Sequence, residues 1–162
     1  MKISRFVLML GIVSLFGGQS LIAQDKKSEK TQRIKELIDG GKYNVEVDRA
    51  FPMGGRSVNL TSSYGIEIKG DSIYSHLPYY GRAYSVPYGG GSGLSFDKPV
   101  TDYEVAYDAD DKATVTFATR SDDDRYEFRI QIYSNGTTTI FVQPTNRQSI
   151  TYHGEFRLKK EE

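Results

Sequence analysis

The sequence predicts an all-β protein, either an antiparallel up-and-down barrel or a two-sheet sandwich of about nine strands, preceded by a short N-terminal helix. Apolar residues alternate with polar ones over most of the chain after residue 41. Short connectors rich in Gly, Asn, Asp and Ser separate the alternating segments. Because no helical spacing lies between these segments, parallel crossover units are not expected. The pattern does not distinguish a barrel from a sandwich.

Residues 1–23 are predicted to be a secretory signal peptide. Lys2 and Arg5 precede an apolar segment that ends at Phe16, and Ala23 offers a small residue for cleavage. The apolar segment is shorter than the roughly 20 residues that span a bilayer. We therefore expect a periplasmic or secreted protein without a membrane span, in which residues 24–162 form a single β-rich domain.

Residues 24–41 carry a helical pattern. Ile34, Leu37 and Ile38 are spaced three and four residues apart in a polar segment. Gly40 and Gly41 then supply a left-handed helix stop. Because the apolar stripe is narrow, we expect this helix to dock on the strands as a lid or plug, and the alternative is a polar leader.

Four short strands are predicted in the first half of the β-rich region. Their apolar positions are Tyr43, Val45 and Val47; Val58 and Leu60; Ile66 and Ile68; and the alternating segment 72–77. Turn residues separate them at 52–55, 62–65 and 69–72. These strands are predicted to form an antiparallel meander.

Five further strands are predicted in the second half. They cover residues 100–107, 112–119, 125–133, 137–143 and 149–158. The connectors 108–111 and 121–124 are acidic and are predicted to be solvated hairpin turns. Asn135-Gly136 predicts a two-residue type I′ hairpin, because both residue types tolerate positive φ.

Residues 78–99 have a different character and are predicted to be a long loop. This segment holds four of the 12 tyrosines and five of the 16 glycines. Long aromatic, Gly-rich loops are usually functional. The loop therefore contains the best candidates for a binding site.

Composition excludes several classes of protein. The chain has no Cys, which removes disulfides, thiolate metal sites, cysteine catalysis and a lipoprotein anchor. Residues 1–23 hold two bases and no acid, so their removal leaves 19 bases against 21 acids, a net charge of −2. A chain this close to neutral is not expected to capture nucleic acid.

The block Leu77-Pro-Tyr-Tyr-Gly-Arg-Ala-Tyr84 resembles a known family. Gly70-Asp71, Phe96, Asn135-Gly136 and Ile150-Thr-Tyr-His-Gly154 extend the match over most of the region after the signal. On these residues the chain resembles domain-of-unknown-function family 4251, which comprises small exported proteins of Bacteroidota. The resemblance implies export and one compact domain, and it implies no activity. Many relatives carry a lipoprotein Cys that this chain lacks, so no lipid anchor is expected.

No catalytic, metal or cofactor constellation is predicted. His76 and His153 are far apart in sequence and show no ligand spacing. The acidic connectors lack the Gly and closing Glu of a calcium loop. The sequence contains no nucleophile elbow or zinc-protease motif. We therefore expect a protein that is not an enzyme, and hydrolase activity is the remaining enzymatic alternative.

The candidate binding residues are Tyr79, Tyr80, Arg82, Tyr84 and Tyr88. Tyrosine offers an apolar face with a polar tip, and arginine forks onto carboxylates or stacks on rings. These residues are predicted either to line a small-ligand or peptide site or to seal one end of the barrel.

Two functions remain open on this basis. The first is a non-enzymatic binding protein for a small molecule or peptide, in which loop 78–99 and the helix together gate a pocket or form a contact surface. The second is a component of envelope protein–protein interaction or assembly with a filled core. Separately, Ser72 lies in the segment Asp71-Ser72-Ile73, which resembles an O-glycosylation acceptor of Bacteroidota.

Overall fold

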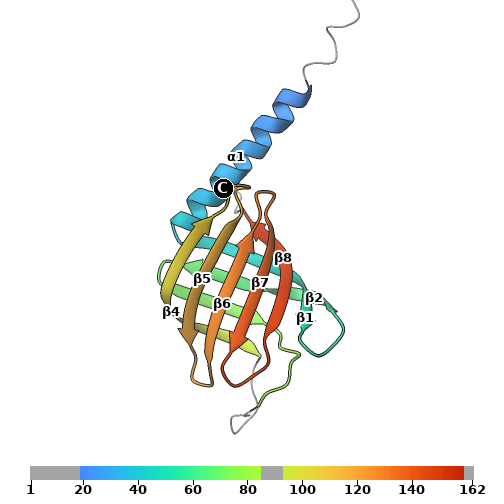
Figure 1. Cartoon of the computed structure of the whole chain (residues 1–162), viewed down its shortest axis with the longest axis vertical. Helices are drawn as coiled ribbons and strands as arrows, with labels where there is room; N and C mark the ends of the chain where they lie inside the picture. Colours follow the sequence, from blue (N-terminus) through green and yellow to red (C-terminus); the bar gives the residue numbers. More distant parts are fainter. Residues whose placement is uncertain (1–18, 85–92, 159–162) are drawn as a thin grey trace, which may run out of the picture.

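Eight antiparallel strands form a closed barrel in the computed structural model, which describes residues 19–84 and 93–158 (Figure 1). Each strand pairs with the next along the chain, and β8 pairs with β1 to close the barrel. The elements are α1 (Gln19–Asp39), β1 (Lys42–Pro52), β2 (Val58–Lys69), β3 (Ser72–Leu77), β4 (Leu94–Tyr107), β5 (Ala113–Arg120), β6 (Arg125–Ile132), β7 (Thr137–Pro144) and β8 (Ile150–Arg157). The all-β prediction is confirmed. Because β1 pairs with β8, the fold is the barrel and not the two-sheet sandwich.

Strand β2 accounts for the difference between nine predicted strands and eight observed. Residues 58–60 and 66–68 belong to one strand rather than two. Val47 pairs with Tyr64 and Arg49 pairs with Asn59, so residues 60–63 stand opposite the single residue Asp48. The Ser-rich segment that predicted a turn is therefore a large irregular bulge within one strand.

Strand β4 shortens the predicted loop 78–99. Leu94–Pro99 pair with Ser72–Leu77, so the last part of the predicted loop is a strand. Leu94 is fully buried, and Phe96 stacks on Tyr126 with ring centroids 4.9 Å apart. The alternation of apolar and polar residues over 94–98 is the strand signal that the Gly-rich context obscured.

The hairpin at Asn135-Gly136 is present, but its predicted turn type was wrong. Among the described non-glycine residues, only Asp102 and Asp111 have positive φ, so Asn135 does not adopt the type I′ conformation. Gly136 has a φ of 92°, and its N–H donates to the carbonyl of Tyr133, while the N–H of Tyr133 donates to the carbonyl of Thr137. This arrangement is a turn closed by a single left-handed glycine.

The barrel interior is filled by apolar side chains from alternate positions of the strands. Fully or almost fully buried residues include Tyr126, Phe128 and Ile130 on β6, Ile140 and Val142 on β7, and Ile150 and Tyr152 on β8. Phe117 and Phe128 stack with centroids 4.9 Å apart. Close packing of this kind leaves little room for a ligand between these strands.

Helix α1 closes one end of the barrel, as the lid or plug prediction states. Ile34 and Ile38 are buried in the core, and Lys30 donates to the carbonyl of Asn135 at 2.6 Å. The Tyr107 hydroxyl donates to Asp39 Oδ1 at 2.7 Å.

Residues 1–18 of the predicted signal peptide lie outside the described residues, and residues 19–23 belong to α1. Within the described ranges, no helix combines the length and apolar character that crossing a membrane requires.

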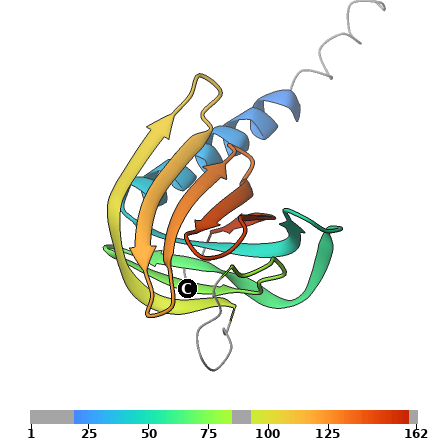
Figure 2. The ribbon, with the colours of Figure 1, turned by 60° about the horizontal axis from the view of Figure 1, so that its bottom comes forward.

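The two ends of the barrel are distinct. Helix α1 lies at the end that holds the β4–β5 and β6–β7 turns, which we call the helix end. The chain after β3, the β5–β6 turn and the β7–β8 connection meet at the opposite end, which we call the loop end (Figures 1 and 2). The prediction that helix and loop gate one pocket together was therefore wrong, because the barrel separates them.

Candidate functional site

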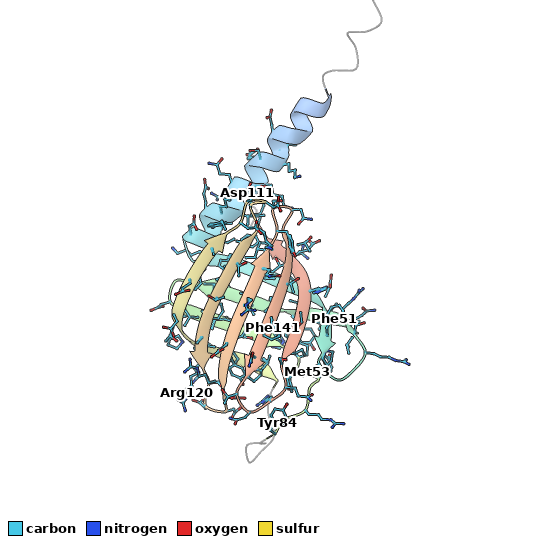
Figure 3. All side chains as sticks on the ribbon, viewed as in Figure 1. Phe51, Met53, Tyr84, Asp111, Arg120 and Phe141 are labelled. Carbon is cyan, nitrogen blue, oxygen red and sulfur yellow. The ribbon has the colours of Figure 1, made fainter. Side chains whose placement is uncertain are left out.

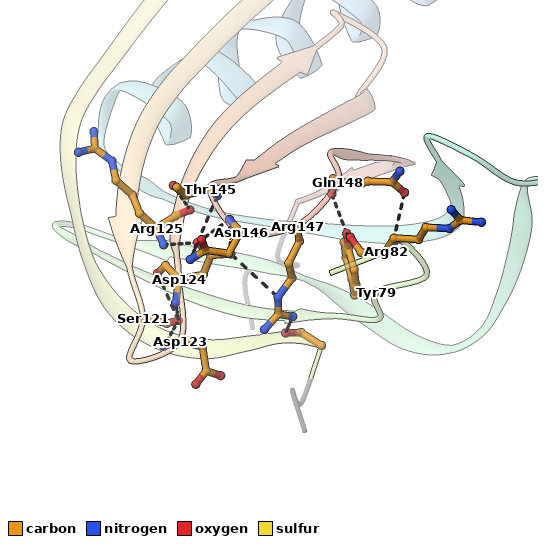
Figure 4. Close-up of polar contacts among 11 residues, drawn as sticks. Tyr79, Arg82, Ser121, Asp123, Asp124, Arg125, Thr145, Asn146, Arg147 and Gln148 are labelled. Atoms are coloured by element: carbon orange, nitrogen blue, oxygen red, sulfur yellow. Dashed lines mark hydrogen bonds and ion pairs between the residues drawn. The ribbon is translucent and has the colours of Figure 1, made fainter. Parts of the chain in front are cut away.

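The loop end is organised around Asp124, whose side chain is only 1% exposed (Figure 4). Its carboxylate accepts hydrogen bonds from the backbone N–H groups of Arg125 (2.8 Å), Thr145 (3.2 Å) and Asn146 (3.1 Å). Ser121 Oγ accepts from the N–H of Asp124 in the same turn. The carboxylate thus ties the β5–β6 turn to the β7–β8 connection, and the prediction of a solvated turn at 121–124 was wrong for Asp124.

Arg147 is the second buried charge at this end, with a side chain 5% exposed. Its Nε lies 4.0 Å from Asp124 Oδ2, which is beyond hydrogen-bond range. Its Nη1 donates to the carbonyl of Gly93 at 3.3 Å, and its guanidinium lies 5.6 Å from the centroid of the Tyr79 ring. Arg147 therefore contacts two segments of the predicted loop 78–99, one at Tyr79 and one at Gly93.

Tyr79 is partly buried, and its hydroxyl contacts the backbone of the loop end. Its hydroxyl donates to the carbonyls of Gln148 (2.8 Å) and Arg82 (3.1 Å), and burial raises its pKa. The Gln148 N–H donates to the Arg82 carbonyl, and Gln148 Oε1 accepts from the Arg82 N–H. For Tyr79 the contacts match the alternative in which the loop seals the barrel end.

The side chains of Tyr80, Arg82 and Tyr84 point to solvent from this pinned segment. Tyr80 is 45% exposed and Tyr84 is 71% exposed, and Arg82 is exposed as well. The N–H of Tyr84 donates to the carbonyl of Asn146 at 2.8 Å, which fixes its backbone. Tyr88 lies outside the described residues.

Met53 joins these residues at the loop end and was missed by the sequence analysis. It lies in the connection between β1 and β2 and is 68% exposed. Figure 3 shows Met53 and Tyr84 at the same end of the molecule. The available signal was an apolar residue in the turn Pro52-Met-Gly-Gly55, where polar residues are usual.

Ser72 lies away from this surface, at the helix end. It is the first residue of β3, is half-buried, and its Oγ donates to Asp71 Oδ1 at 3.2 Å. O-glycosylation at Ser72 stays a prediction.

The histidines pack as surface strand residues. His76 contacts Tyr64 with ring centroids 5.2 Å apart, and His153 contacts Phe51 at 4.4 Å. The described part of the chain contains no group of three or more His, Cys, Asp or Glu side chains placed to hold a metal ion.

Four surface hollows outlined by the described residues are open to solvent, and none of the four includes Tyr79, Tyr80 or Tyr84 in its lining. Three of them are lined by strand residues: one lies over β1–β4, one over β4–β7 and one over β1, β2 and β8. The predicted tyrosines therefore form part of a projecting surface rather than the wall of one of these hollows.

Comparison with known proteins shows the family of this chain and a solved structure with a similar fold. The model of a family described as a domain of unknown function, DUF4251, matches residues 25–156. The chain belongs to the DUF4251 family. A crystal structure of a DUF4251 family protein from Bacteroides eggerthii DSM 20697 is similar to it, with a TM-score of 0.65 and 15% sequence identity. The similarity covers 82% of this chain and 90% of that one. The comparison with curated proteins found no match.

The DUF4251 match confirms the resemblance inferred from the block 77–84. In the structure this block contains the end of β3 and the segment pinned to the β7–β8 connection. Part of the most specific sequence motif is thus explained by packing, since Leu77 is buried and Tyr79 is bonded to two carbonyls.

Proposed function

We propose that this protein is an exported, non-enzymatic binding protein that contacts an envelope protein through its loop end. The contact surface consists of Tyr80, Arg82, Tyr84 and Met53. In this proposal the protein is located in the periplasm or outside the cell. This proposal develops the second function expected from the sequence, an interaction component with a filled core.

Exposed aromatic side chains on a fixed backbone carry the proposal. The hydrogen bonds of Tyr79, Gln148 and Asn146 hold the segment 79–84, while Tyr80 and Tyr84 stay exposed. Such an arrangement costs little conformational entropy on binding. Tyr and Arg are also the residue types most enriched among those that dominate binding energy at protein interfaces.

The filled interior supports a surface contact over an enclosed small-molecule site. Tyr152 occupies the interior near the loop end, and its hydroxyl donates to the carbonyl of Pro78 at 2.8 Å. Asp124 and Arg147, the buried charges described at this end, are engaged by structural contacts. These contacts support binding rather than catalysis.

Site-specific photocrosslinking in the native envelope tests the proposal. A photoreactive phenylalanine analogue replaces Tyr84 in one variant and Tyr80 in another. We expect both variants to yield the same crosslinked partner protein, and the change Arg82→Ala to reduce that yield several-fold. The partner is identified by mass spectrometry.

A matched control carries the same analogue at Gln32, which is exposed on α1 at the helix end. The proposal predicts no partner from this position. Equal crosslinking from Gln32, or no partner protein from positions 80 and 84, contradicts a contact surface at the loop end. A small molecule retained in native mass spectra and lost on Tyr84→Ala would instead favour the ligand-binding alternative.

A further inference from the structure

One hollow on the barrel wall is lined by acidic and basic side chains from several strands. It has a volume of about 280 Å³ and lies over the outer faces of β4, β5, β6 and β7. Figure 1 shows these strands facing the viewer, and Figure 3 labels Phe141, which contributes to the lining. The hollow is separate from the loop-end surface, so the inference does not depend on the proposed function.

Strand register places Glu104 on β4 across the hollow from Arg125 and Arg129 on β6, and Glu127 lies between these two arginines on β6. Glu104 on β4 pairs with Thr116 on β5, which pairs with Arg129 on β6, which pairs with Phe141 on β7. Adjacent strands are about 4.8 Å apart, so the backbones that carry Glu104 and Arg129 are separated by about 10 Å. The intervening β5 contributes the small residues Thr116 and Ala118 to the lining, together with the largely buried Phe117.

A bulge in β4 adds a second carboxylate. Thr101 pairs with Ala118 and Glu104 with Thr116, so Asp102 and Tyr103 stand opposite the single residue Phe117. Asp102 has a φ of 55°, a left-handed conformation that non-glycine residues rarely adopt. Bulges of this kind redirect side chains, and Asp102 lines the hollow together with Glu104.

Only part of the charge that lines this hollow is neutralised within it. Among the described residues, no ion pair involves Asp102, Glu104 or Arg129, while Arg125 lies 3.8 Å from Glu127. In the hollow over β1–β4, by contrast, Glu46 pairs with Arg157 at 2.7 Å. In the hollow beside α1, Lys35 pairs with Asp111 at 2.6 Å.

We propose that this hollow binds a small zwitterion, an amino acid or dipeptide with a free ammonium and a free carboxylate. The ligand's ammonium lies against Glu104 and Asp102, and its carboxylate accepts from the Arg129 guanidinium. Phe141 and Ala118 provide an apolar surface for its side chain. A ligand of one or two residues suits the hollow, because the strands that carry Glu104 and Arg129 are only about 10 Å apart.

Nuclear magnetic resonance titration of the isotope-labelled protein tests this inference, with L-leucine and L-leucyl-L-alanine as separate probes. We expect saturable shifts of the amide signals of residues 102–104, 116–118 and 127–129, with a dissociation constant on the order of 1 mM for the better probe. The comparison of the two probes decides between an amino acid and a dipeptide.

Two variants and a blocked peptide make the test specific. Glu104→Gln and Arg129→Gln each weaken binding about tenfold or more, and N-acetyl-leucyl-alanine amide, which has neither charge, does not bind. Both substituted residues are exposed, so the fold is retained, which circular dichroism checks. Glu155→Gln, on the outer face of β8, leaves the affinity unchanged.

Several outcomes overturn the inference. They are the absence of saturable shifts with both zwitterions, equal binding of the blocked peptide, shifts confined to other parts of the barrel, and unchanged affinity in the Glu104 and Arg129 variants.

Discussion

At the residue scale, Asp124 shows how a single side chain organises the loop end. Its oxygens accept three backbone N–H groups from two connections that are 20 residues apart in sequence. No pattern in the sequence separates Asp124 from the neighbouring Asp122, whose side chain is exposed. The difference arises only when the barrel brings the β7–β8 connection beside the β5–β6 turn.

We predict that Asp124→Ala destabilises the protein by about 3 kcal/mol. The change leaves buried N–H groups without an acceptor and Arg147 without a nearby negative charge. Asp124→Asn retains one acceptor oxygen, so it lowers the free energy of unfolding by less than Asp124→Ala does. Urea denaturation measures both, with the exposed Asp122→Ala as a control expected to lie within about 0.5 kcal/mol of the original protein. A change below 1 kcal/mol for Asp124→Ala contradicts this role.

At the element scale, α1 and β4 depend on each other. β3 pairs only with residues 94–99 of β4, so Thr101–Tyr107 pair with β5 on one side alone. The Tyr103 hydroxyl donates to the carbonyl of Ile38 at 3.4 Å, and Tyr107 bonds Asp39. The helix, the bulge at Asp102 and the acidic side chains protect a strand edge that would otherwise invite pairing with another chain.

We predict that Ile38→Asp releases α1 from the barrel and promotes self-association. Ile38 is fully buried, and a carboxylate at that position is solvated only if the helix leaves. Light scattering after gel filtration should detect concentration-dependent oligomers, with lower thermal stability. Gln32→Asp, on the exposed face of α1, serves as the matched control. Its oligomeric state and thermal stability should equal those of the original protein. A monomeric Ile38→Asp protein of unchanged stability would show that the helix does not protect the edge.

At the scale of the whole molecule, buried tyrosines link stability to alkaline pH. Burial raises the pKa of Tyr43, Tyr126 and Tyr152. The neutral form of each is therefore favoured in the folded state. Their contribution is complete below the unfolded pKa of about 10 and is lost as the pH rises above it.

We predict that the free energy of unfolding falls steeply above pH 10, by up to about 1.4 kcal/mol per pH unit for each buried tyrosine. Urea denaturation between pH 8 and pH 11.5 measures the slope. Tyr152→Phe should make the slope shallower, and the exposed Tyr84→Phe should not. An identical slope in Tyr152→Phe would show that this residue is not responsible.

The alternation of apolar and polar residues made the strands of the barrel predictable from the sequence. The candidate site was less predictable, because it depends on contacts between residues far apart in the chain. Val45, Ile68 and Ile130 face the interior as their spacing indicates. The composition of the segment with Tyr80, Arg82 and Tyr84 predicted it as a candidate site, but no local pattern separates these residues from Tyr79. That separation depends on Gln148, which is 69 residues away and bonds Tyr79 only after β7 and β8 have paired. Long-range contacts of this kind leave no local pattern.

The position of α1 has a practical consequence for handling the protein. The part of α1 that follows the predicted signal peptide, residues 24–39, has 16 residues and corresponds to about 24 Å of helix, and residues 25–30 are exposed (Figure 1). β8 also ends at the helix end, where the Phe156 N–H donates to the carbonyl of Gly136. A biosensor chip or fluorescent fusion attached ahead of α1 is therefore held at a distance by a stiff spacer. Tyr80 and Tyr84 then face the solution, so immobilised protein presents them in one orientation to any partner that is passed over it.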